Sequence, residues 1–161
     1  MNVLSKLREA TPADYDSLGA LVYDAIHHGP TQYSPAQSRA WMAAPPKGDA
    51  WAKRMAGKQV IVADAGHALV GFMTLEPGGY VDFAYIRPEA QGSGLFRRLF
   101  ETVEARAIEA GETALSTHAS LMAQPAFAAM GFQIDHHETI EKDGEQLARA
   151  RMTKPLTKDD A

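Results

Sequence analysis

The sequence predicts a mixed α/β domain built around one sheet, and three observations support this fold class. Strand-like and helix-like segments alternate along the chain, with most of the strands in its second half. Three short apolar segments in the middle are separated by Ala-Gly-His and Gly-Gly, which is typical of an antiparallel meander. One long amphipathic segment follows them. The strands on its two sides should lie parallel, because such crossover connections are right-handed and return to the same sheet.

The N-terminal part of the chain predicts one strand followed by helices. Thr11 can cap a helix and Pro12 suits its first turn, with Asp14 three residues after the cap. In the next helix, Ser34 and Gln37 are spaced as a capping box. The expected elements are a strand over residues 3–10 and helices over 11–26, 34–41 and 50–56.

The rest of the chain predicts the remaining strands, one long helix and a closing hairpin. In the long helix, Leu95, Leu99 and Val103 recur every four residues, and Gly111 ends the pattern. The whole chain, residues 1–161, is expected to form one domain, with 155–161 as a frayed tail. The expected elements are strands over 59–65, 68–77, 80–86 and 113–120, helices over 95–110 and 121–130, and a hairpin of 132–141 with 145–154.

Composition and charge restrict the function classes. The 161 residues include no cysteine, which excludes disulfides, thiolate metal ligands and a cysteine nucleophile. A formal net charge of −4 and a pI near 5.8 disfavour a nucleic-acid-binding surface. The apolar runs are shorter than the roughly 20 residues of a membrane span, and the first residues lack an apolar signal region. We therefore expect a cytoplasmic protein, either a monomer or a homodimer, without nucleic-acid or membrane partners.

The segment Gln91-Gly-Ser-Gly94 loosens the backbone immediately before the long helix. Arg97 stands where a dinucleotide-binding fingerprint would place its third glycine, and the chain has no Walker phosphate-binding motif. A helix N-terminus offers unpaired N–H groups and the positive end of the helix dipole, which suit a pyrophosphate. Taken alone, the loop is equally compatible with an ordinary glycine-containing turn.

Two motifs resemble those of the GNAT family of N-acetyltransferases. The acetyl-CoA-binding pattern of the family is V-x-P-x-x-[RQ]-G-x-G-[IL]-[GA], and Phe96 departs from its last position. The chain matches this pattern at Ile86, Pro88, Gln91, Gly92, Gly94 and Leu95. A second family segment, N-x-x-A-x-x-x-[YF]-x-x-x-G-F, is matched at Ala123, Phe127, Gly131 and Phe132, with Ser120 in place of asparagine. Residues 33–41 and 117–127 further resemble the YafP-like bacterial subgroup of the family.

This resemblance implies the fold, the activity and the cofactor. The fold would be a mixed, largely antiparallel sheet of about seven strands, with helices on both faces and a parallel, splayed pair at strands 4 and 5. The activity would be direct transfer of acetyl from acetyl-CoA to a primary amine of a small molecule or a protein, without an acyl-enzyme. The residues that correspond to the family's acetyl-CoA site are Ala84, Tyr85, Ile86, Gln91, Gly92, Ser93, Gly94, Leu95, Phe96, Arg97, Ser120 and Phe127.

Direct transfer needs a neutral amine, whose proton a base or a water chain removes. Asp82 is the leading candidate for the base, because it is an acid within an apolar strand, where burial would raise its pKa. His118, at the end of a strand beside the splay, is the second candidate. Tyr85 is a weaker one. Each also has a purely structural interpretation. The aspartate could be hydrogen-bonded to loop amides, the histidine could be a partly buried structural residue, and the tyrosine could pack against its neighbours.

Phe127 leaves the proton for the departing thiolate without an obvious donor, because many family members have a tyrosine acid at this position. Two alternative functions therefore remain open. One is a non-catalytic sensor or scaffold that binds CoA or acyl-CoA, and the other is an acyltransferase that uses a longer acyl-CoA.

Three aromatic residues in the N-terminal half, Tyr33, Trp41 and Trp51, are candidates for the acceptor pocket, although aromatic packing between short helices explains the two tryptophans equally well. The histidine pairs at 27–28 and 136–137 invite a metal interpretation. Adjacent histidines on a strand point to opposite faces, however, and no further ligand has suitable spacing. No metal site is expected.

Overall fold

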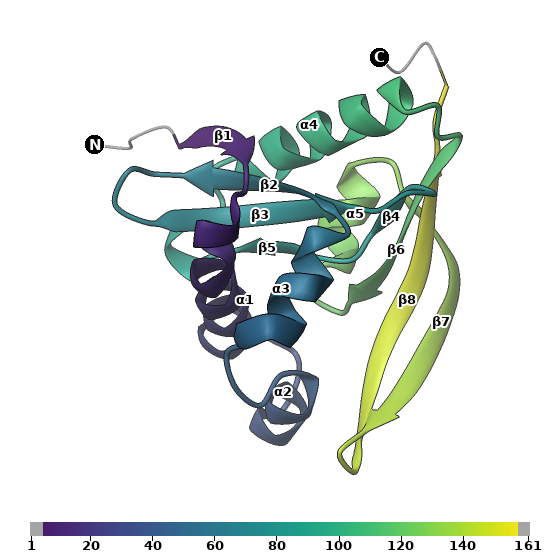
Figure 1. Ribbon diagram of the computed structural model, residues 1–161. Coiled ribbons are helices and arrows are strands. Elements are labelled where there is room, and N and C mark those ends of the chain that lie inside the picture. The colour runs from purple at the N-terminus through teal and green to yellow at the C-terminus, as the bar shows by residue number, and fades with distance from the viewer. Residues whose placement is uncertain (1–4, 158–161) are drawn as a thin grey trace.

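Residues 5–157, the part of the chain that this computed structural model describes, fold into two four-stranded sheets and five α-helices (Figure 1). One sheet has the strand order β1-β2-β3-β5 and is antiparallel. The other has the order β4-β6-β8-β7, and its pair β4 and β6 is parallel. The mixed α/β class that the sequence predicts is confirmed.

The N-terminal elements follow the predicted order. β1 (Lys6–Glu9) is followed by a 3-10 turn, η1 (Pro12–Asp14), that leads into α1 (Tyr15–His28). α2 (Pro35–Trp41) begins with the predicted capping box, because the Ser34 N–H donates to Gln37 Oε1 at 2.8 Å and the Gln37 N–H donates to Ser34 Oγ at 3.1 Å. α3 (Gly48–Ala56) completes this part.

The first sheet has helices on both of its faces. Its strands β2 (Gln59–Asp64) and β3 (Leu69–Leu75) direct alternate side chains into two separate core clusters. Ile61 and Ala63 pack in the cluster that includes α4 (Leu95–Glu109). Val60 and Val62 pack in the cluster that includes α1 and α3. This alternation confirms the expected layering of helices on both sides of the sheet.

The second sheet holds the first part of the strand expected over 80–86 and the strand that follows α4. β4 (Tyr80–Val81) lies parallel to β6 (Ala114–Ser120), so the predicted crossover through α4 is present. α5 (Gln124–Ala129) and a hairpin of β7 (Gln133–Lys142) and β8 (Glu145–Pro155) follow. The hairpin turns at Asp143 and Gly144, whose φ angles of 51° and 80° fit a two-residue type I′ turn.

The strand expected over 80–86 is interrupted at Asp82 and Phe83, and this interruption separates the two sheets. β4 pairs with β6, whereas β5 (Ala84–Ile86) pairs with β3. The buried Thr74 fixes the interruption, because its hydroxyl accepts the Phe83 N–H at 2.9 Å while its own N–H donates to the Phe83 carbonyl at 2.9 Å. The sheet of about seven strands is thus divided into two sheets, and β5 separates from β6 as the resemblance implied.

The fold continues past the point where the tail was expected to fray. Pro155 is the last residue of β8. Leu156 is buried, and its N–H donates to the Thr113 carbonyl at 2.8 Å. These contacts correct the expected start of the tail, while residues 158–161 lie outside the described part of the chain.

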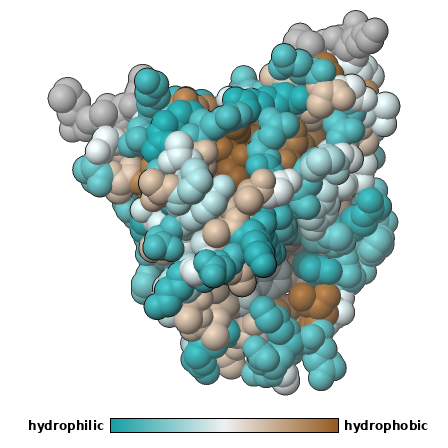
Figure 2. All heavy atoms as spheres, viewed as in Figure 1, coloured by the Kyte–Doolittle hydropathy of each residue, from teal (hydrophilic) through white to brown (hydrophobic). Residues whose placement is uncertain are grey.

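The face of the molecule shown in Figure 2 is largely polar. Hydrophilic residues cover most of this face. Ile134, with 43% of its surface exposed, is the large hydrophobic residue that stands out on the described part of the chain. Among residues 5–157, no helix is both long enough and apolar enough to cross a membrane.

Candidate active site

A cleft of about 680 Å³ opens where the two sheets separate, between β5, the start of α4 and the segment from β6 to α5. Its wall is mainly apolar and includes most of the residues that the resemblance assigned to acetyl-CoA. These are Ala84, Tyr85, Ile86, Gln91, Gly92, Gly94, Leu95, Phe96, Arg97 and Ser120. The predicted cofactor residues therefore come together in one place, although they belong to four segments of the chain.

The glycine loop has the backbone geometry of an anion-binding turn. Gly92 and Gly94 have φ angles of 75° and 82°, a left-handed conformation that residues with a Cβ rarely adopt. A Cβ added at either position would meet nothing within 4 Å, so a ligand can approach the main chain closely there. Gly94 is also the N-cap of α4, whose first N–H groups have no partner within the helix. Ser93 stabilises this turn, because its hydroxyl donates to the Ala90 carbonyl at 2.6 Å.

Phe127 lies in the core instead of the cleft. Its ring is 2% exposed and makes edge-to-face contacts with Phe96 and Phe132, at centroid distances of 5.3 and 5.0 Å. This packing also gives a reason for Phe96, where the family pattern has Gly or Ala, since the Phe96 ring covers Phe127. Phe127 is therefore not in the wall of the cleft, where it was expected, but it lines a smaller cavity beside the cleft.

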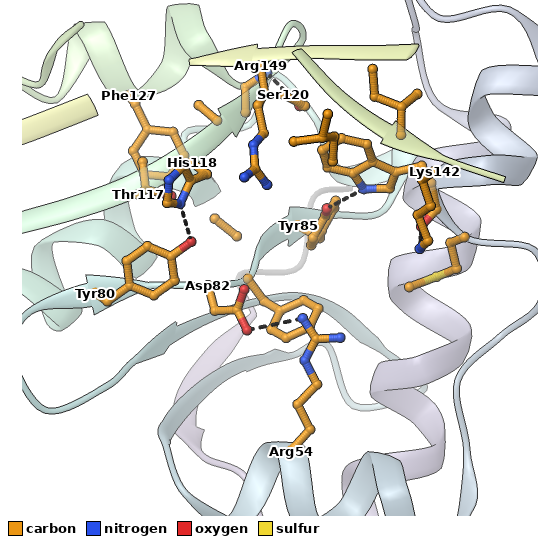
Figure 3. A pocket seen from close by; sticks show the side chains of 18 residues that line it. Arg54, Tyr80, Asp82, Tyr85, Thr117, His118, Ser120, Phe127, Lys142 and Arg149 are labelled. Carbon is orange, nitrogen blue, oxygen red and sulfur yellow. Dashed lines mark hydrogen bonds and ion pairs between the residues drawn. The ribbon is translucent and has the colours of Figure 1, made fainter. Parts of the chain in front are cut away.

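A second cavity, of about 230 Å³, adjoins the cleft and shares part of its wall. The residues common to both are Trp41, Ala84, Tyr85, Ser120 and Ala123. Side chains from α3, β4, β6 and the β7–β8 hairpin enclose it, as Figure 3 shows. The three predicted base candidates, Asp82, Tyr85 and His118, all lie in its wall. A molecule in this cavity would face a molecule in the cleft across Tyr85.

His118 is held at both of its ring nitrogens. Its Nδ1 lies 2.7 Å from the Tyr80 hydroxyl, and its Nε2 lies 3.4 Å from a carboxylate oxygen of Glu138 (Figure 3 shows the first contact). Burial lowers the pKa of His118, and the positive charge of Arg149 lowers it further. The negative charge of Glu138 acts in the opposite direction but does not cancel this effect. The imidazole is therefore neutral near pH 7.

Asp82 has ion pairs around it, in contrast to the apolar burial that its strand predicted. Its Oδ2 is 3.2 Å from Arg54 Nη2 and 3.6 Å from Lys58 Nζ. With 22% of the side chain exposed, the carboxylate is also accessible to solvent. The expectation of burial is wrong here because the strand is interrupted at Asp82 and the side chain meets cations of α3 and of the turn after it.

Tyr85 and Trp41 form the boundary between the cleft and the smaller cavity. Trp41 Nε1 donates to the Tyr85 hydroxyl at 3.4 Å, and burial raises the pKa of Tyr85. Tyr33 stacks on Trp41 but lines only the cleft, since its hydroxyl donates to the Ala148 carbonyl at 2.6 Å. Of the three predicted acceptor-pocket residues, Trp41 is therefore the one that reaches the smaller cavity, since Trp51 is buried against Phe83.

Sequence reasoning missed Tyr80, Glu138 and Arg149. The parallel register pairs Tyr80 with Ser116, two residues before His118 on β6, and the hairpin register brings Glu138 opposite Arg149. The one available signal was for Tyr80, which precedes Asp82 by two residues and so shares its side of the expected strand. Nothing in the local pattern of β8 distinguishes Arg149 from Arg151.

The first histidine pair takes part in ordinary contacts, and His136 of the second lies 3.9 Å from Glu138. His27 Nε2 lies 2.6 Å from the Met42 carbonyl, and His28 Nδ1 lies 2.8 Å from Asp24. Among the described residues, no group of three or more His, Cys, Asp or Glu side chains is arranged to hold a metal ion.

Comparisons with known proteins agree with the two motifs. The family model described as "Acetyltransferase (GNAT) domain" matches residues 30–154. The chain is 29% identical over 140 residues to the uncharacterized N-acetyltransferase YafP of Escherichia coli (strain K12), a match that covers 86% of this chain and 88% of YafP. The predicted resemblance to the YafP-like subgroup is thereby confirmed.

Solved structures share the fold. A GCN5-related N-acetyltransferase from Rhodopseudomonas palustris, also described as a class-II aminotransferase, is 28% identical with a TM-score of 0.85, over 97% of this chain and 99% of its own. The acetyl-CoA complex of yncA from Salmonella typhimurium has a TM-score of 0.72 at 20% identity, over 96% and 95% of the two chains. A phosphinothricin acetyltransferase from Sinorhizobium meliloti, also with acetyl-CoA, has a TM-score of 0.72 at 22% identity, over 95% and 89%.

Proposed function

The chain belongs to the GNAT family of acyl-CoA-dependent N-acetyltransferases, and we propose that it transfers acetyl from acetyl-CoA directly to the primary amine of a small molecule. The observation that carries this proposal is the pair of adjoining cavities, of about 680 and 230 Å³, with Tyr85 in the wall of both. The smaller one is below the roughly 300–1,000 Å³ of sites for drug-sized ligands, which favours a small acceptor. A thioester at the junction would lie beside an amine in this cavity.

Three features of the cleft support acetyl-CoA as the donor. The left-handed backbone at Gly92 and Gly94, together with the start of α4, suits the pyrophosphate. The exposed Arg97 adds a positive charge to the same wall. The residues of β5 line the cleft, and β5 pairs with β3 but not with β6, so main-chain groups on its free edge can pair with an extended ligand. Two neighbours with this fold hold acetyl-CoA.

Tyr80 and His118 provide a path for the amine proton. With Nε2 facing Glu138, the imidazole carries its proton there, and Nδ1 accepts the Tyr80 hydroxyl. The Tyr80 oxygen can take a proton from the attacking amine while its own proton passes to His118. Glu138 then stabilises the imidazolium that results. Because both ring nitrogens are occupied, His118 acts through Tyr80 and not by direct contact with the amine.

Asp82 is the weaker candidate for the base. Its carboxylate is already engaged by Arg54 and Lys58, and it would have to exchange one of these cations for the amine proton. We assign it a positioning role, because the ion pair with Arg54 ties α3 to the strand interruption that lines the cavity.

Tyr85 is our candidate to protonate the departing thiolate in place of the tyrosine that Phe127 replaces. It lies in the wall common to the two cavities, where the thioester would be cleaved. Its hydroxyl accepts from Trp41, and its raised pKa keeps the phenol protonated near pH 7. The absence of cysteine from the chain agrees with direct transfer, since no thiol is available for an acyl-enzyme.

A thiol-release screen tests the proposed function. Acetyl-CoA is offered with single amines from several classes, including polyamines, amino acids, aminoglycosides and short peptides, and each acetylated product is identified by mass spectrometry. We expect release of CoA with at least one small amine. If acetyl-CoA raises the melting temperature but no amine releases CoA, the protein is a CoA-binding sensor. Faster release of CoA from donors with longer acyl chains would instead identify the protein as an acyltransferase that prefers a longer acyl-CoA.

A further inference from the structure

The acceptor cavity contains a positive group that the proposed transfer does not use. Resting on the proposed function, we propose that the acceptor is a small amine that also carries a carboxylate, and that Arg149 binds this carboxylate. Arg149 comes from β8, and its guanidinium projects into the cavity between His118 and Tyr85 (Figure 3).

Arg149 has unused hydrogen-bonding capacity inside the cavity wall. Its Nε is buried and has no hydrogen-bond partner among the described residues. Its Nη2 meets Glu138 at 3.5 Å, the long end of the range for a charged pair. A buried N–H without an acceptor lowers the stability of the folded protein. A ligand that accepts a hydrogen bond from this N–H would remove that cost. A carboxylate fits, because its two oxygens match the parallel N–H groups of a guanidinium.

The charge of the cavity favours the same kind of ligand. Its wall holds three cationic side chains, Arg54, Lys142 and Arg149, against one carboxylate, Asp82. Asp82 is paired with Arg54 and Lys58. Glu138, which lies outside this wall, offsets part of the charge of Arg149 at 3.5 Å, but the wall itself keeps a net positive charge. An acid group is attracted there, whereas a simple alkylammonium ion is repelled. The same positive charge favours the neutral form of a bound amine, which is the form that attacks the thioester.

The size and lining of the cavity restrict the acceptor further. A volume of about 230 Å³ admits a molecule of amino-acid size and excludes a folded protein segment of several residues. Trp41, Phe83 and Leu147 contribute apolar surface to the same wall. With its carboxylate on Arg149, such a molecule can direct its amine toward Tyr80 or Tyr85, which lie on either side of the guanidinium's position in the cavity. The acceptor class is therefore a small amino acid or a similar amino-carboxylate with an apolar side chain.

Matched acceptors test the carboxylate. Initial rates of CoA release are compared for an apolar amino acid, its amide, and the amine that lacks the carboxyl group, with acetyl-CoA at saturation. We expect kcat/KM for the acid to exceed that for the amide by about 10- to 100-fold, the usual effect of a charge-assisted hydrogen-bonded pair. The difference should lie mainly in KM, because the carboxylate is bound in the same way before and during transfer.

Variants of two arginines on the same strand identify the binding residue. Arg149→Gln should reduce the preference for the acid over the amide to near one, and Arg149→Lys should retain part of it. Arg151→Gln is the matched control, since Arg151 is outside the cavity wall, yet its charge, like that of Arg149, lowers the pKa of His118. The control should keep the full preference. Melting temperatures establish that each variant is folded.

Two results would overturn the inference. One is wild-type protein that acetylates the amide or the simple amine as efficiently as the acid. The other is a folded Arg149→Gln variant that keeps the wild-type preference. Either would leave the acetyltransferase proposal intact, whereas an absence of CoA release with every amine would contradict that proposal itself.

Discussion

A substitution at Gly94 tests directly whether acetyl-CoA lies close to the main chain of the glycine loop. The φ of Gly94, 82°, is left-handed, and a Cβ built there would meet nothing within 4 Å. Gly94→Ala therefore introduces backbone strain without a clash. The strain of an L-residue in this conformation is about 1–2 kcal/mol. In a domain of this size that corresponds to a fall in melting temperature of about 2–8 °C.

Binding should suffer more than stability. A methyl group at Gly94 keeps an anionic ligand away from the main chain, and losing one hydrogen bond to a charged group costs about 1.5–3 kcal/mol. The Kd for acetyl-CoA should then rise by roughly 10- to 150-fold. Isothermal titration calorimetry measures this change, and thermal unfolding without ligand measures the strain.

Gly66→Ala is the matched control for this substitution. Gly66 has a φ of 93°, and a Cβ there also meets nothing within 4 Å, but it lies in the β2–β3 turn, outside the cleft wall. Both variants should lose similar stability, and only Gly94→Ala should lose affinity. Equal affinity of the two variants would refute the assignment of the loop and reduce it to an ordinary turn.

Three further substitutions separate the roles assigned in the two cavities, and a fourth tests the ion pair between Arg8 and Asp14. His118→Gln should lower kcat about 10²- to 10⁴-fold. It should also abolish the fall of kcat/KM at acid pH, because the imidazole accepts the proton only when it is neutral, which requires a pH above its lowered pKa. An unchanged pH–rate profile would assign proton removal to water. Asp82→Asn should change kcat by no more than a few-fold and stability by about 0–1 kcal/mol, as for a partly exposed ion pair; a loss of 10²-fold or more would return the base role to Asp82. Tyr85→Phe should slow the release of thiolate without weakening acetyl-CoA binding, and a single-turnover rate equal to the wild type would argue against it as the acid. The hydrogen bond from Arg8 lowers the pKa of Asp14 to about 2. The stability that this pair contributes is therefore fully present above a pH of about 4 and is lost as the pH falls through about 2. The difference in melting temperature between Asp14→Asn and the wild type should shrink over that interval.

Features that depend on neighbouring residues were accessible to sequence reasoning. The capping box of Ser34 and Gln37 and the glycine loop at 92–94 are set by a few consecutive residues, and both are present as expected. The alternation of Val60, Ile61, Val62 and Ala63 between two clusters follows from the period of a strand.

Features that depend on register were not accessible. The interruption at Asp82 requires a hydrogen bond from Phe83 to Thr74, nine residues away in a neighbouring strand. This interruption changed the surroundings of Asp82 from apolar to ionic. The contact of His118 with Tyr80 depends on the pairing of β4 with β6, and the placement of Arg149 depends on the β7–β8 hairpin. Local composition carries no information on these pairings, because the same residues could be paired in several ways.

The central claim is that acetyl passes directly from the cofactor in the cleft to an amine in the adjoining cavity. Once an acceptor is known, initial rates measured over a matrix of acetyl-CoA and acceptor concentrations test this claim. Direct transfer requires both substrates to be bound together, so double-reciprocal plots should intersect, and protein incubated with acetyl-CoA alone should keep its unmodified mass. Parallel lines together with an acetylated protein would show a ping-pong reaction through an acyl-enzyme and contradict the claim.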